Sequence, residues 1–72
     1  MSKEAILIEN YLKSNCSDFW NVIEHRGIII CNFLSELKFT VQKDDTEHWN
    51  ITGQDISMNM IYNIALLLNE NY

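Results

Sequence analysis

Apolar and polar residues alternate strictly from residue 37 to residue 42. The apolar positions are Leu37, Phe39 and Val41. The polar positions between them are Lys38, Thr40 and Gln42. Successive side chains of a β-strand point to opposite faces of a sheet, so this pattern predicts a strand with one buried face and one solvated face. We therefore expect the three apolar residues in the core and the three polar residues on an open, polar face.

Two further segments are typical of strands. Ile28–Phe33 is apolar and rich in β-branched residues, which predicts a buried strand. Residues 43–47 are polar and rich in turn-forming residues, as in a hairpin loop. Trp49–Thr52 then predicts a short third strand, with Trp49 and Ile51 facing inward. Together with residues 37–42, these segments predict a small antiparallel three-stranded meander.

Both ends of the chain have the apolar spacing of helices. Ser2–Ser14 carries one stripe made of Ala5, Ile8, Tyr11 and Leu12. Ser2 is expected to cap that helix. Asp55–Asn69 is the stronger helical segment, and we expect Asp55 to cap it. Its stripe contains Ile56, Met60, Ile64, Leu67 and Leu68.

Residues 17–26 fit two structures. Ser17 or Asp18 suits the start of a short helix that ends at Gly27, and this interpretation is slightly favoured. The alternative is a fourth strand in which Trp20 and Val22 face the same way, followed by a tight hairpin loop. Both alternatives stay open at the level of the sequence.

The expected fold class is α+β in one small domain spanning residues 1–72. The N- and C-terminal helices are expected to pack on one face of the three-stranded meander, with the extra helix or fourth strand at 17–26 beside it. The composition supports folding, because 47% of the residues are hydrophobic and only 21% are charged.

The net charge of −5 limits the kinds of partner. Ten acidic residues outnumber five basic ones, so nucleic acid and anionic membranes would be repelled. A protein with a basic surface would be attracted. The sequence therefore predicts a protein partner, without direct contact to nucleic acid or membrane.

Four residues have side chains that could bind zinc: Cys16, His25, Cys31 and His48. They are scattered singly, whereas structural zinc sites pair their ligands two to four residues apart. Cys31 lies in an apolar strand, which raises a thiol pKa and makes the thiol inert. We expect no catalytic, metal or cofactor site, and no enzyme. Two cysteines in a chain whose start does not resemble a signal peptide suggest reduced thiols and a cytoplasmic location.

Acidic residues cluster on the loop between the last two predicted strands. This loop is the candidate for contact with a basic partner, with a tryptophan as apolar anchor, because Trp is enriched in binding hot spots. The expected partner-binding residues are Glu36, Asp44, Asp45, Glu47, His48, Trp49 and Trp20. Tyr72 is a further candidate for an exposed anchor.

In size, charge and order of elements the chain is similar to certain phage-encoded inhibitors, including some anti-CRISPR proteins, although it shares no motif with them. This similarity implies a small inhibitor encoded by a phage or mobile element. Such a protein would bind a basic, nucleic-acid-handling host protein by occlusion or by mimicking nucleic acid, or would act like an immunity protein. The alternative is a homo-oligomeric structural or accessory subunit, for example a homodimer, that associates through the C-terminal helix.

Overall fold

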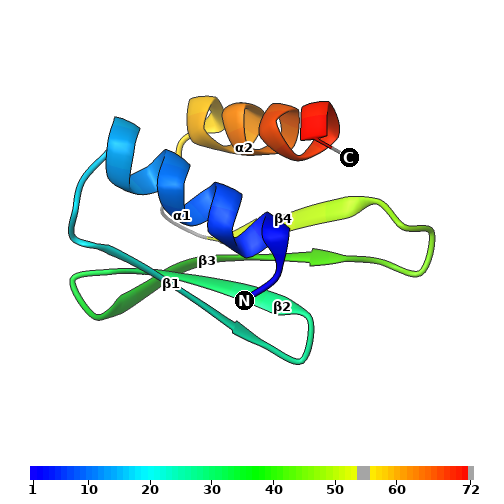
Figure 1. Cartoon of the computed structure of the whole chain (residues 1–72), viewed down its shortest axis with the longest axis horizontal. Helices are drawn as coiled ribbons and strands as arrows, with labels where there is room; N and C mark the ends of the chain where they lie inside the picture. Colours follow the sequence, from blue (N-terminus) through cyan, green and yellow to red (C-terminus); the bar gives the residue numbers. More distant parts are fainter. Residues whose placement is uncertain (54–55, 72) are drawn as a thin grey trace.

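The computed structural model describes residues 1–53 and 56–71, without the side chains of residues 70 and 71. This part of the chain forms two helices and four strands, which confirms the α+β class (Figure 1). In chain order the elements are α1 (Lys3–Asn15), β1 (Trp20–His25), β2 (Ile28–Phe33), β3 (Glu36–Lys43), β4 (Trp49–Gly53) and α2 (Met58–Asn71).

The four strands form one antiparallel sheet in the order β1-β2-β3-β4. The slightly favoured short helix at 17–26 is wrong, and the fourth-strand alternative is right. Pairing with β2 explains the outcome, because the ladder satisfies the backbone of β1 while Trp20 and Val22 enter the core on one side.

Two tight turns connect the first three strands. Arg26 and Gly27 join β1 to β2 with φ angles of 52° and 79°. Leu34 and Ser35 join β2 to β3 with φ angles of 53° and 65°. Positive φ at both central residues matches the twist of a two-residue hairpin. Glycine adopts it freely, whereas Arg26, Leu34 and Ser35 adopt it at a steric cost.

Both helices lie on the same side of the sheet (Figure 1). Ser2 caps α1 as expected, since its hydroxyl accepts a hydrogen bond from the backbone N–H of Ala5 at 3.2 Å. The expected cap Asp55 lies outside the described residues. The Ser57 hydroxyl accepts a hydrogen bond from the Met60 N–H at the start of α2.

The core forms between the helices and one face of the sheet. Its helical members are Ala5, Ile8, Leu12, Ile64 and Leu68. Its strand members are Trp20, Val22, Ile29, Cys31, Phe39 and Val41. All buried residues of this cluster are apolar, and the described residues contain no buried polar or charged side chain.

A β-bulge between β2 and β3 changes which side chains of β3 face the core. Cys31 pairs with Phe39, but the next residue, Asn32, pairs with Leu37. Lys38 is the extra residue, so the alternation of the strand breaks at that point. Leu37 therefore lies on the face away from the helices and is 60% exposed. The expectation that Leu37 is core and Lys38 lies on the open face with Thr40 is wrong.

Candidate functional site

The face of the sheet opposite the helices, called here the outer face, carries apolar residues among uncharged polar ones. One cross-strand row runs Ile23, Ile30, Thr40, Thr52, and a second row runs Asn21, Asn32, Leu37. His25 pairs with Ile28, and Gln42 pairs with Asn50, to form the remaining positions. The apolar patch is defined by Ile23, Ile28, Ile30 and Leu37.

No outer-face position of the described strands carries an aspartate, glutamate, lysine or arginine. The charged strand residues lie in the rows that face the helices instead. Glu24 accepts a hydrogen bond from the backbone N–H of Ser2 at 2.6 Å. Lys43 lies over the ring of Trp49, with its Nζ 5.1 Å from the ring centroid. Of the two faces of the sheet, the one that the helices leave open to water is the uncharged one, although the chain carries a net charge of −5.

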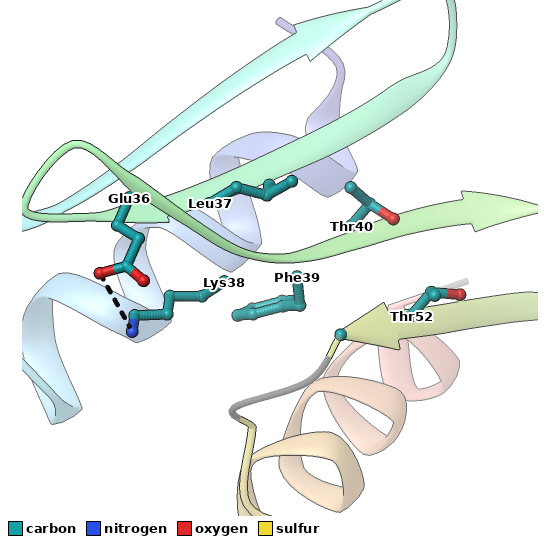
Figure 2. A pocket seen from close by; sticks show the side chains of 7 residues that line it. Glu36, Leu37, Lys38, Phe39, Thr40 and Thr52 are labelled. Atoms are coloured by element: carbon teal, nitrogen blue, oxygen red, sulfur yellow. Dashed lines mark ion pairs between the residues drawn. The ribbon is translucent and has the colours of Figure 1, made fainter.

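Figure 2 shows how the bulge separates the side chains of β3 at a pocket of about 410 Å³. Leu37 and Thr40 point to one side, while Lys38 and Phe39 point to the other. The Lys38 ammonium pairs with the Glu36 carboxylate at 3.7 Å, which keeps both charges off the outer face. The pocket ends at Gly53, which pairs with Phe39.

Two exposed apolar side chains extend the outer face at the end where β2 turns into β3. Phe19 is 65% exposed and Leu34 is 63% exposed. The backbone N–H of Leu34 donates to the carbonyl of Phe19 at 3.4 Å, so the two residues are held next to each other. The Phe19 ring also contacts Phe33 edge-on, with centroids 6.4 Å apart. Both side chains line a surface hollow of about 690 Å³ with Asn21 and Asn32.

The acidic loop lies at the other end of the sheet, and Asp44 organises it. Its carboxylate accepts hydrogen bonds from the N–H and the hydroxyl of Thr46, the N–H of His48 and the side-chain amide of Asn50. These bonds hold the pKa of Asp44 well below the usual range of a carboxyl, the Thr46 hydroxyl contributing most. Asp44 therefore serves mainly to build the loop, while Asp45 and Glu47 remain as exposed acids.

The other predicted partner-binding residues do not form one site. Trp20 is only 9% exposed and packs against Phe33 and Phe39, so it belongs to the core. Trp49 is half-buried against the core. Glu36 lies at the far end of β3 from the acidic loop. His48 stays in the loop, where its Nδ1 lies 2.7 Å from the Thr46 hydroxyl. Tyr72 lies outside the described residues.

Helix α2 is apolar on two opposite sides. Its inner stripe contains the buried residues Ile64 and Leu68. Its outer stripe, spaced by four residues, contains Met58, Tyr62 and Leu66, all exposed. Residues 58–69 contain no charged side chain. The sequence-based stripe is thus partly core, and the exposed stripe is a different one.

The described cysteines and histidines do not converge. Cys16 is exposed and Cys31 is buried, and burial raises the pKa of the Cys31 thiol to about 12. The raised pKa confirms the prediction for Cys31. The described residues contain no cluster of three or more histidine, cysteine or acidic side chains suited to a metal ion. Among those residues, neither helix is long and apolar enough to cross a membrane.

The residues that sequence reasoning missed are those of the outer face and its end. Strict alternation assigned Leu37 to the core, because a bulge leaves no mark in the alternation itself. The apolar sequence around Ile28 and Ile30 predicted a strand buried on both faces. Phe19 and Leu34 flank turn-forming residues. The one available signal was that an apolar leucine occupies a two-residue turn, where Asn or Gly is preferred.

No protein-family model matches the chain, and neither a curated protein nor a solved structure matches it.

Proposed function

We propose that the protein acts by binding another protein through the outer face of its sheet, and that it is not an enzyme. The observation that carries this proposal is the uncharged outer face, which bears the apolar patch, on a chain of net charge −5. Surfaces that face only water normally carry the charged residues, and the centres of protein interfaces are depleted of them. Exposed apolar side chains that adjoin one another mark a contact surface.

The partner is proposed to carry basic groups around an apolar centre. Asp45 and Glu47 lie on the loop that closes one end of the outer face, the end at which Arg26 also lies. Asp18 lies next to Phe19 at the opposite end, in a hollow that Lys13 also lines. Acids at the rim of an apolar patch raise the association rate with a basic partner and select against acidic ones. The apolar patch would supply most of the affinity, and the rim would supply steering and selection.

A basic partner that handles nucleic acid would be inhibited by this contact. Its lysines and arginines would be covered by the acidic rim, so that phosphates could no longer reach them. This is inhibition by occlusion, of the kind expected for a small inhibitor encoded by a phage or mobile element. We favour occlusion over nucleic-acid mimicry, in which the acids of the loop would stand in for phosphates. The Asp44 carboxylate already accepts four hydrogen bonds within the loop.

The experiment is affinity capture from candidate host lysates, followed by titration of each recovered protein after purification. We expect a recovered protein with an excess of Lys and Arg to bind with a strong salt dependence. Ile23→Thr should weaken that binding by about tenfold, because it removes apolar area at the centre of the patch while keeping a strand-forming residue. Unchanged affinity in Ile23→Thr would refute the sheet face as the contact surface.

Two charge-reversal variants test the contribution of the acidic residues. Glu47→Lys reverses a charge at the rim, and Glu9→Lys makes the same change on α1, in the opposite layer. Glu47→Lys should slow association and reduce its salt dependence, whereas Glu9→Lys should have a much smaller effect. Equal effects of the two variants would show that only net charge matters. Asp44 is left intact, because changing it would also disrupt the loop.

A second candidate function is self-association through α2, favoured by the exposed stripe Met58, Tyr62 and Leu66. A helix that is apolar on both sides is usually buried on both sides. Two copies of an acidic chain repel each other, so an uncharged surface is the one that permits contact between them. Sedimentation at increasing concentration tests this: a dimer that Tyr62→Asp abolishes supports the role, and a monomer at all concentrations refutes it.

A further inference from the structure

We infer that the turn Leu34–Ser35 holds Leu34 as an anchor for the partner's apolar centre, at the expense of the stability of the fold. This inference rests on the proposed function, because the anchor is assigned to the same outer face. The partner chemistry is that of the proposal: a protein with an apolar recess bordered by basic groups.

The backbone of the β2–β3 turn is strained. Both central residues have positive φ, at 53° and 65°, and neither is glycine. The left-handed region is unfavourable for a side chain with a Cβ, and least so for Asn. The other two-residue turn of the sheet has Arg26, with a φ of 52°, at its first central position and Gly27 at its second. The β2–β3 turn has no glycine, so it carries strain at both positions, which common turn residues would relieve.

The side chain of Leu34 is exposed although its backbone is strained. Leu34 is 63% exposed, so it gains little from burial in return for its backbone conformation. Within the monomer Leu34 is unfavourable for two reasons: its backbone adopts a conformation that prefers Asn, and its apolar side chain is exposed to water. Strained residues of this kind persist where the strained geometry presents a group for function.

Other exposed apolar side chains lie near Leu34. Phe19, bound to it through the backbone at 3.4 Å, presents a second exposed apolar side chain at the same end of the sheet. Leu37, on the outer face, begins the apolar patch two positions beyond the turn. The hollow beside Phe19 is lined by one acid, Asp18, and one base, Lys13. The preference for a recess bordered by basic groups therefore comes from the net charge of −5.

The test separates stability from binding with two single variants. Leu34→Asn relieves strain and removes the apolar side chain, while Ser35→Gly relieves strain and leaves Leu34 in place. Each should raise the midpoint of thermal unfolding, by about 4 °C for a domain of this size. Binding should weaken by about tenfold or more in Leu34→Asn and should weaken much less in Ser35→Gly, which keeps the Leu34 side chain.

The binding probe is a displayed library of short random peptides, selected on the immobilised wild-type protein. Peptides that combine apolar residues with Lys or Arg should be enriched, and the tightest is then synthesised and titrated against each variant by fluorescence anisotropy. If Leu34→Asn binds that peptide as tightly as the wild type does, the anchor is refuted. The anchor is also refuted if Leu34→Asn lowers the midpoint of thermal unfolding, because the wild-type turn is then not strained.

The outcomes also separate the anchor from the proposed function. Loss of peptide binding in Ile23→Thr together with normal binding in Leu34→Asn would overturn the anchor and support the sheet face. Normal binding in both variants, or the absence of any enriched peptide, would overturn the proposed function and the anchor with it.

Discussion

Leu37 lies directly opposite Asn32 on the outer face of the sheet, two residues before Phe39, which lies opposite Cys31 on the face that the helices cover. The bulge at this point reverses which side chains of β3 face the core on the Leu37 side of the bulge. It takes a leucine out of the core and places it in the apolar patch. The same step turns Lys38 toward Glu36 and removes its charge from the outer face.

The first prediction uses this register. Leu37→Thr should change the free energy of unfolding by less than about 0.5 kcal/mol, because Leu37 is largely solvent-exposed already. Val41→Thr introduces the same residue at a buried position and should cost about 1–3 kcal/mol, because it buries a hydroxyl in an apolar core. Urea unfolding of both variants measures the difference. Equal destabilisation would show that Leu37 is a core residue.

The second prediction concerns Gly53, where β4 comes close to β3. A Cβ at this position would lie 2.5 Å from the Lys38 carbonyl oxygen and 2.6 Å from the Phe39 Cβ. Gly53→Ala should therefore destabilise the fold by about 1–3 kcal/mol, since backbone has to shift to accept the methyl group. Gly27→Ala is the contrast, because a Cβ there meets no atom within 4 Å and its cost comes from the positive φ alone. Wild-type stability of Gly53→Ala would refute the close approach.

The third prediction concerns pH and Asp44. The folded-state pKa of Asp44 is lowered by its hydrogen bonds, so its contribution to stability is complete above the unfolded-state pKa of about 4 and is lost as the pH falls below that value. The unfolding midpoint of the wild type should exceed that of Asp44→Asn by a constant amount between about pH 5 and 7. The difference should shrink below about pH 4.

Circular dichroism melts over this pH range measure the Asp44 effect. Asp45→Asn is the control, since it removes a charge from the same loop without touching the Asp44 hydrogen bonds. A difference for Asp44→Asn that does not depend on pH, or one that grows as the pH falls, would contradict the role of the carboxylate.

The fourth prediction concerns the two thiols. Cys16 is exposed, whereas Cys31 is buried with its pKa raised to about 12. Iodoacetamide at mildly alkaline pH should modify Cys16 in the folded protein and Cys31 only in denaturant, because the thiolate is the reactive form. Because the folded-state pKa of Cys31 is raised, its contribution to stability is complete below about pH 8.5 and is lost as the pH rises toward 12. Mass spectrometry of the digested protein identifies the modified residue, and rapid labelling of Cys31 would contradict its burial.

Much of the fold could be predicted from short-range patterns. Ser2 and the helical stripe ending at Leu12 identified α1, and β-branched residues identified β2. Residues 17–26 were ambiguous because their identity as a strand depends on a partner, β2, that lies beyond the segment itself. Local propensity does not contain that information.

The candidate site was harder to predict than the fold. The acids of the loop were visible in the sequence. The sequence does not reveal that the Asp44 carboxylate accepts hydrogen bonds from the loop's own backbone. Trp20 appeared as a candidate for an exposed anchor, since aromatic residues occur both in cores and in interfaces. The outer face emerged only from the register, because a bulge at one residue decides whether Leu37 faces the core or the solvent.

The central claim is that the outer face binds a partner, and amide chemical-shift mapping tests it most directly. Isotope-labelled protein is titrated with the tightest selected peptide or with the purified captured partner. The account predicts shifts centred on Ile23, Ile30 and Leu37, extending to Leu34, with α1 largely unaffected. Shifts confined to α2, or to the acidic loop without the apolar patch, would contradict it.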